Sequence, residues 1–153
     1  MPMPDELEDL VNKLQAGDQM LGWISGQVVS SYNNGDFFAS FLGLCVLVEQ
    51  AVRERADSVD GDYMKAIELL RDDGALNSKE FEILANLKIM QDQVSNTYMH
   101  APSLAPRFAN DPEDVVWTYN EATTWEEFMK LHLLTYMRII SRRSGVEDNH
   151  DNY

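Results

Sequence analysis

Apolar residues recur at spacings of three and four along most of the chain, which is the period of an α-helix. No proline occurs between Pro4 and Pro102, so no residue in that span lacks the backbone N–H that a helix needs. The pattern predicts an all-α protein, a bundle of five or six mostly antiparallel helices. The predicted helices cover residues 5–16, 18–31, 37–56, 63–70, 77 or 78 to 99, and 123 or 124 to 143.

Polar residues and glycines mark several helix ends. Asp36 is suited to cap the third helix, and Gly74 to end the fourth, because glycine adopts the left-handed backbone found there. Asn77 or Ser78 precedes the fifth helix, with Glu80 close behind, which is the spacing of a capping box. These signals predict a sharp start for the long fifth helix.

The third predicted helix is apolar on nearly every side as far as Val48 and then becomes charged. A helix that is hydrophobic all round is buried, so we expect it to be the most buried element. Cys45 lies in this stretch and is the one cysteine of the chain, so no intrachain disulfide can form. We expect Cys45 to be a small buried hydrophobe, and nothing in the sequence points to an oxidising compartment.

The composition is strongly acidic. In 153 residues, 26 Asp and Glu face 12 Lys and Arg, which gives a net charge of −14. Such a charge repels nucleic acid and disfavours binding of nucleic acid by the protein alone. Four explanations stay open: a solvated acidic surface, a salty cytoplasm, a basic protein partner, and mimicry of a polyanion.

No segment has the pattern of an export signal or a membrane span. The first residues, MPMPDELED, carry acids where a secretory signal has a basic region. The longest apolar stretch, FFASFLGLCVLV, is shorter than the roughly 20 residues that a membrane-spanning helix needs. We therefore expect a cytoplasmic protein with no membrane contact.

One helical domain is predicted over residues 1–145, followed by a disordered acidic tail at 146–153. Residues 101–122 contain three of the five prolines and little periodicity, which indicates a long ordered loop or a lid of short turns. Loops of this length in compact domains are often functional.

Most enzyme signatures are missing from the sequence. There is no glycine-rich phosphate loop, no histidine and glutamate pair at metal-binding helical spacing, no serine elbow and no cysteine cluster, so no cofactor or metal is predicted. His150 lies in the polar tail. His132 lies four residues from both Phe128 and Tyr136, and this aromatic helix face favours a core histidine over a catalytic one.

Basic residues are few. Arg138, Arg142 and Arg143 cluster at the end of the last helix, where cations complement the helix dipole. They form the one local basic patch, and together with Arg107 they are the candidate phosphate-binding residues.

His100 is the strongest candidate for chemistry. It stands where the long helix, ending in SNTYMH, meets the proline-containing loop, and Asn96 lies four residues before it on the same face. A structural interpretation is also open, in which the two polar residues tie the end of the helix to the loop.

The order of elements from residue 36 to about 116 resembles the HEPN superfamily of helical bundles and, within it, the mannitol operon repressor family. The segments that carry this likeness are FFASFLGLCVLVEQAVRERA, MKAIELLRDDGALNSKEFEIL, the helix ending in SNTYMH, and the loop with NDPEDV. They span about half of the chain.

In HEPN ribonucleases the long helix ends in an arginine, usually followed by a polar residue, with a histidine four to six residues beyond the arginine. In those ribonucleases this arginine and histidine are the catalytic pair. The histidine moves protons while a 2′-hydroxyl attacks the phosphate, and the arginine stabilises the developing negative charge. Here Asn96 matches the polar position and His100 the histidine, but Ser95 stands at the arginine position. An uncharged hydroxyl cannot replace a guanidinium.

The sequence therefore favours a catalytically degenerate HEPN-like module that acts as a regulatory or protein-binding homodimer, with a transcriptional co-regulator as one form of it. The resemblance implies that dimers form through the helices that carry the motif. The alternatives are a metal-independent, toxin-type ribonuclease, in which His100 works with Arg107 or Arg142, and an acidic inhibitor that mimics nucleic acid.

Overall fold

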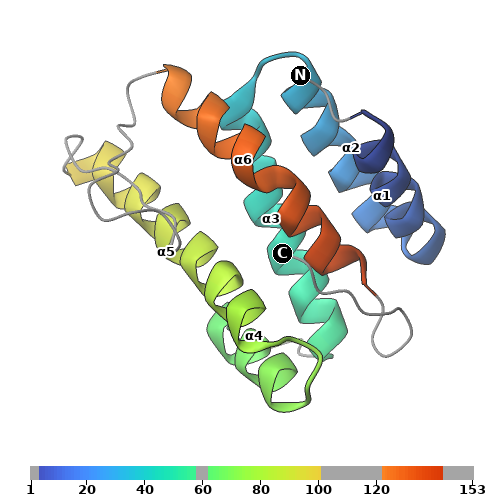
Figure 1. Cartoon of the computed structure of the whole chain (residues 1–153). Helices are drawn as coiled ribbons and strands as arrows, with labels where there is room; N and C mark the ends of the chain where they lie inside the picture. Colours follow the sequence, from blue (N-terminus) through green and yellow to red (C-terminus); the bar gives the residue numbers. More distant parts are fainter. Residues whose placement is uncertain (1–3, 58–61, 101–121, 143–153) are drawn as a thin grey trace.

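The computed structural model describes residues 4–57, 62–100 and 122–142, and every element in these ranges is a helix (Figure 1). The elements are α1 (Pro4–Gly17), α2 (Gln19–Asn33), α3 (Phe37–Ala56), α4 (Tyr63–Asp72), α5 (Ser78–His100) and α6 (Ala122–Ser141). The long helices α2, α3, α5 and α6 reverse direction from one to the next (Figure 1). The predicted all-α bundle is confirmed, and the loop predicted at 101–122 lies almost wholly outside the described residues.

Most helix ends follow the local signals. Asn77 Oδ1 accepts a hydrogen bond from Glu80 N at 2.8 Å, and Glu80 Oε1 accepts one from Asn77 N at 3.0 Å, so the predicted capping box is confirmed with Asn77 as the cap. Gly74 has a φ of +82°, as expected of a residue that ends a helix. Asp36 occupies the cap position of α3, but its carboxylate makes no capping hydrogen bond.

The last helix differs most from its prediction. It begins at Ala122 instead of residue 123 or 124, and it ends at Ser141 instead of residue 143. The error is one or two residues at each end, which is the usual uncertainty for a helix terminus.

Helix α3 occupies the centre of the bundle and packs against α2, α4, α5 and α6 (Figure 1). Its side chains Phe41, Leu44, Leu47 and Val48 are fully buried, as its apolar sequence predicts. The expectation that α3 would be the most buried helix holds only in part, because α6 is buried to a similar extent through residues such as Phe128, Leu133 and Tyr136.

Two buried tyrosines hold α5, the helix that carries the candidate motif. The Tyr63 hydroxyl of α4 donates to the carbonyl of Leu84 at 2.8 Å, and the Tyr136 hydroxyl of α6 donates to the neighbouring carbonyl of Ile83 at 3.3 Å. Burial raises the pKa of Tyr63, so its hydroxyl stays protonated and remains a donor. The middle of α5 is thereby tied to both neighbouring helices.

Candidate functional site

Ser95, Asn96 and His100 all lie in the last turns of α5, which runs without interruption to His100. Asn96 and His100 are therefore one turn apart along the same helix, as the sequence predicted. The structure describes the backbone of these three residues but not their side chains. Arg107, Arg143 and His150 lie outside the described residues. Their roles stay predictions.

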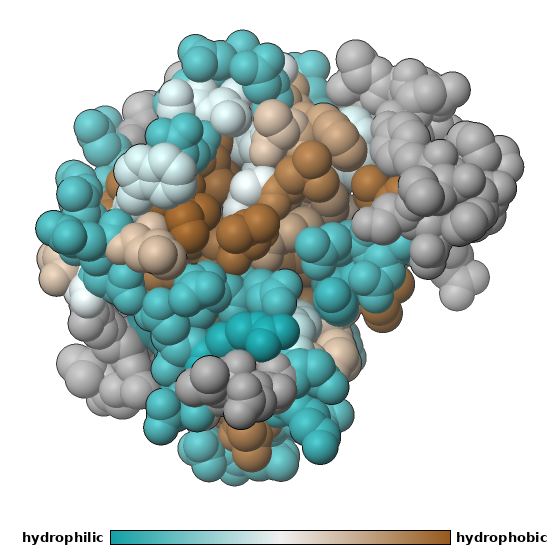
Figure 2. All heavy atoms as spheres, turned by 180° about the vertical axis from the view of Figure 1, so that it is seen from behind, coloured by the Kyte–Doolittle hydropathy of each residue, from teal (hydrophilic) through white to brown (hydrophobic). Residues whose placement is uncertain are grey.

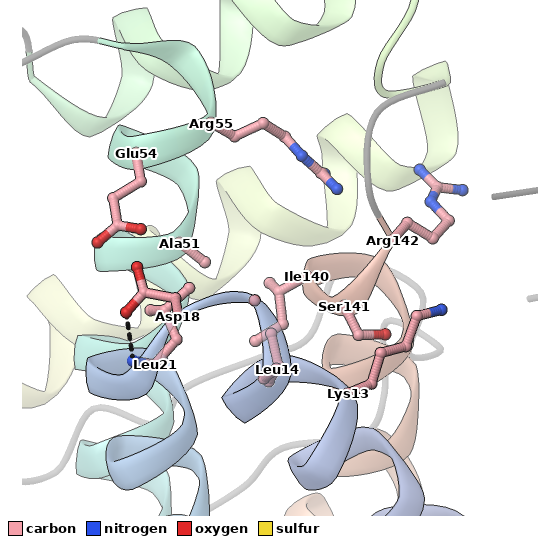
Figure 3. Close-up of a pocket in the computed structure, with 11 residues that line it drawn as sticks. Lys13, Leu14, Asp18, Leu21, Ala51, Glu54, Arg55, Ile140, Ser141 and Arg142 are labelled. Carbon is pink, nitrogen blue, oxygen red and sulfur yellow. Dashed lines mark hydrogen bonds between the residues drawn. The ribbon is translucent and has the colours of Figure 1, made fainter. Parts of the chain in front are cut away.

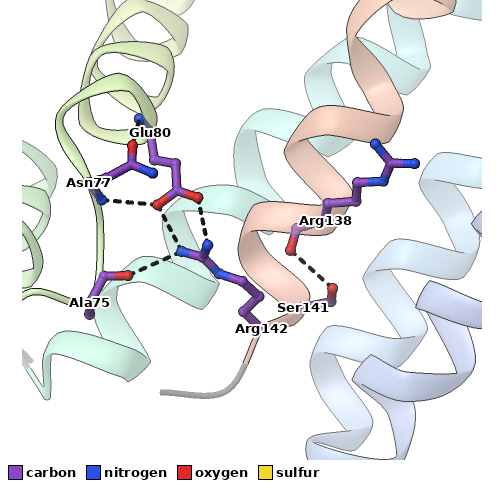
Figure 4. A network of polar contacts seen from close by, with 6 residues as sticks. All are labelled: Ala75, Asn77, Glu80, Arg138, Ser141 and Arg142. Carbon is purple, nitrogen blue, oxygen red and sulfur yellow. Dashed lines mark hydrogen bonds and ion pairs between the residues drawn. The ribbon is translucent and has the colours of Figure 1, made fainter. Parts of the chain in front are cut away.

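Arg142 follows the end of α6 and reaches across to the start of α5 (Figure 4). Its guanidinium donates to both carboxylate oxygens of Glu80, at 2.6 and 2.8 Å, and to the carbonyl of Ala75 at 3.1 Å. The Glu80 side chain is 1% exposed and that of Arg142 is 21% exposed. Because Glu80 also accepts from Asn77 N, one carboxylate joins the capping box to the end of α6.

Arg138 makes a second bidentate pair, one turn earlier on α6. It donates to the two carboxylate oxygens of Glu6 in α1, at 2.8 and 3.0 Å. Both side chains are partly exposed, at 39% and 46%, so water screens this pair more than the Arg142 pair. Of the four arginines predicted to contact phosphate, the two that the structure describes are thus held by carboxylates.

His132 lies on α6 and is partly buried. Its ring is tilted against that of Phe128, with the ring centroids 4.9 Å apart and the planes at 51°. This packing on an aromatic face agrees with the interpretation of His132 as a core residue.

A pocket of about 390 Å³ opens between the ends of four helices (Figure 3). We call it the polar pocket. It is lined from α1, α2, α3 and α6 by Lys13, Leu14, Gly17, Asp18, Leu21, Ala51, Glu54, Arg55, Ile140, Ser141 and Arg142. Its volume lies in the range of small-molecule sites, roughly 300–1,000 Å³.

Two carboxyl groups meet on one side of the polar pocket. Asp18 caps α2 by accepting from Met20 N at 2.9 Å and from Leu21 N at 3.1 Å. The hydrogen bond from Glu54 lowers the pKa of Asp18, while desolvation and that same bond raise the pKa of Glu54. When the pair holds a single proton, Glu54 therefore carries it and Asp18 is the charged partner.

The cationic groups of the polar pocket lie on the other side. Figure 3 shows the ends of Lys13, Arg55 and Arg142 away from the two carboxyl groups, with apolar side chains between. The acidic and the basic groups of the polar pocket are therefore separated from each other.

The polar pocket was not predicted from the sequence. Asp18 follows Gly17 and is recognisable as a helix cap, but nothing in the sequence places Glu54 beside it or Arg55 in the same pocket. In the described parts of the chain, no group of three His, Cys, Asp or Glu residues is arranged to hold a metal ion. No helix among the described residues is long and apolar enough to cross a membrane.

These features define an all-helical bundle whose polar groups near the end of α6 are engaged with one another. No protein-family model matches the chain, and no curated protein or solved structure is similar enough to it to count as a match. The resemblance to HEPN and mannitol repressor proteins therefore stays a prediction from the sequence.

Proposed function

We propose that this protein is a catalytically degenerate, HEPN-like regulatory module that acts by binding protein partners. The observation that carries the proposal is Ser95, which stands where the resemblance implies a catalytic arginine. Cleavage of RNA by a 2′-hydroxyl requires a fixed cation at the phosphate, and its loss costs roughly 3–4 kcal/mol of transition-state stabilisation.

Arg138 and Arg142 support this proposal, because neither is placed to supply the missing charge without cost. Arg142 would have to leave Glu80, whose carboxylate is 1% exposed and would remain as an unpaired charge in the core. Arg138 is held by both oxygens of Glu6.

The proposed mode of action is contact with proteins, in the cytoplasm and as a homodimer. A net charge of −14 opposes binding of DNA or RNA by the protein alone. A transcriptional co-regulator of this kind would reach DNA only through a basic partner protein.

Incubation of the purified protein with single-stranded and structured RNA tests the lack of catalysis. We expect no cleavage by the wild-type protein or by the His100→Ala variant. The Ser95→Arg variant returns a guanidinium to the motif position, and we expect it to gain cleavage that His100→Ala abolishes. Cleavage by the wild type that is lost in His100→Ala would overturn the proposal and establish a ribonuclease.

Measurement of DNA binding at low and high salt tests the mode of action. We expect no binding by the protein alone and recovery of a basic protein from the native host in a pull-down. Tight, salt-sensitive binding of DNA by the pure protein would remove the co-regulator interpretation.

A further inference from the structure

The region from Gln19 to Val48 contains a single charged residue, Asp36, in a chain in which 25% of residues are charged. Helix α2 has no charged residue, and α3 has none before Glu49. In a protein with a net charge of −14, one whole helix and the first part of the next without charge are a departure from the rest of the chain.

Burial does not account for this lack of charge. Trp23 and Met20 on α2 are 67% and 57% exposed, and Val46 on α3 is 55% exposed. Leu42 is also exposed on α3, and Gln27 on α2. Figure 2 shows apolar side chains gathered over the middle of the rear face of the molecule, with hydrophilic residues around them.

The exposed residues belong to one surface because α2 and α3 lie in close contact. The Ser40 hydroxyl of α3 donates to the carbonyl of Val28 in α2 at 2.8 Å. A Cβ atom at Gly43 would lie 3.0 Å from Val28 Cγ2, so the two helices approach closely. We call the surface formed by Met20, Trp23, Gln27, Leu42 and Val46 the α2–α3 face.

The α2–α3 face has the composition of an interface core. Such cores lack charge and are enriched in Trp and Met, and exposed tryptophans are frequent anchors of binding energy. Exposed apolar patches rimmed by polar residues mark sites of contact with other molecules.

From this pattern of charge we infer that the α2–α3 face binds a second copy of this chain. Two copies with a charge of −14 repel each other, and an uncharged face is where they can meet without placing like charges in contact. A basic partner would instead gain from the acidic surfaces, such as α1 with Asp5, Glu6, Glu8 and Asp9. The inference rests on the dimer of the proposed function and moves its contact from α5 to α2 and α3.

The size of the face predicts a weak dimer. Helix α2 has 15 residues, which corresponds to a length of about 22 Å, and two adjacent helices are about 20 Å wide. The footprint is therefore roughly 450 Å² per copy, below the roughly 800 Å² of a standard interface. We expect a reversible dimer whose population depends on protein concentration.

Sedimentation velocity over a range of protein concentrations tests the inference with three matched variants. Val46→Glu places a carboxylate on the α2–α3 face, and two-fold symmetry brings it near its counterpart. Ile89→Glu and Leu131→Glu make the same change at residues of α5 and α6 that are 52% and 63% exposed. We expect Val46→Glu to weaken dimerisation at least tenfold and the two controls to leave it unchanged, with circular dichroism confirming that all three fold. Val46→Ser, which adds no charge, should weaken the dimer less.

Two results would overturn the inference. A wild-type protein that is monomeric at every concentration would remove the dimer, and loss of the dimer in Ile89→Glu but not in Val46→Glu would place the contact on α5. Neither result affects the RNA-cleavage test, so failure of this inference is distinguishable from failure of the proposed lack of catalysis.

Discussion

Gly22 lies where α1 and α2 approach each other closely. A Cβ atom added there would lie 2.4 Å from Gln15 Cβ and 2.5 Å from Gln15 Cα, whereas a Cβ at Gly26 would meet nothing within 4 Å. We expect Gly22→Ala to lower the free energy of unfolding by about 1–3 kcal/mol, because the backbone of α1 must move. Gly26→Ala should raise it by about 0.5–1 kcal/mol, because alanine restricts the unfolded chain.

Urea unfolding followed by circular dichroism measures both changes. Equal effects of the two substitutions would show that α1 does not lie against α2 at Gly22. The sequence could not separate these two glycines, since both stand in the interior of the same helix. Only the position of Gln15, in another helix, makes them different.

Glu54 provides a prediction on pH dependence. Its pKa is raised in the folded protein by desolvation and by the hydrogen bond with Asp18, so the folded state binds this proton more tightly than the unfolded state. The stabilisation is present below the ordinary pKa of 4.5 and is lost as pH rises through the raised value. In Glu54→Gln the amide can donate to Asp18 at any pH.

We therefore expect Glu54→Gln to unfold at a higher temperature than the wild type at pH 7, with the difference closing as pH falls toward 4. Thermal melts between pH 4 and pH 8 measure this, and the exposed Glu82→Gln on α5 is the matched control. A difference that is constant over this range would argue against a shared proton between Glu54 and Asp18.

One ion pair, Arg142 with Glu80, joins the start of α5 to the end of α6, and we expect its loss to destabilise the contact between the two helices. Arg142→Ala leaves the Glu80 carboxylate, 1% exposed, without its bidentate partner. We expect a loss of about 3 kcal/mol in the free energy of unfolding, as for other broken buried pairs. Arg138→Ala breaks the partly exposed pair with Glu6 and should cost less than about 1 kcal/mol.

The comparison of these two arginines separates a structural role from a phosphate-binding role. If Arg142→Ala unfolded no more easily than Arg138→Ala, the Glu80 pair would contribute little to the fold. Arg142 would then be available for a ligand near the start of α5.

Helix boundaries were predictable where the signal is local. The capping box of Asn77 and Glu80 is written within four consecutive residues, and the structure forms it as expected. Asp36 shows the limit of such signals, because its cap position was found but its capping hydrogen bond does not form. The ion pair between Glu80 and Arg142 joins residues far apart in the chain, so the spacing of residues within one helix could not predict it.

At the scale of the whole molecule, the period of the apolar residues was sufficient for the fold class. It could not supply the polar pocket, which needs residues of four helices at one place. It also could not supply the α2–α3 face, because an apolar residue at helical spacing is expected in the core. Trp23, 67% exposed, is recognised as a surface residue only once its neighbours are placed.

The net charge of −14 leads to a prediction for the whole molecule. Acids outnumber bases by more than two to one, so repulsion between surface charges at pH 7 opposes the compact state. Raising NaCl from about 20 mM to about 500 mM shortens the screening length several-fold and should raise the melting temperature at pH 7. Screening also weakens pairs such as Arg138 with Glu6, but each of these contributes at most about 1 kcal/mol.

The matched measurement is the same titration near pH 4.4, the isoelectric point, where we expect the effect to vanish. A melting temperature that falls with salt at pH 7 would show that attractive pairs outweigh the repulsion, and would remove the electrostatic reason for an uncharged contact face.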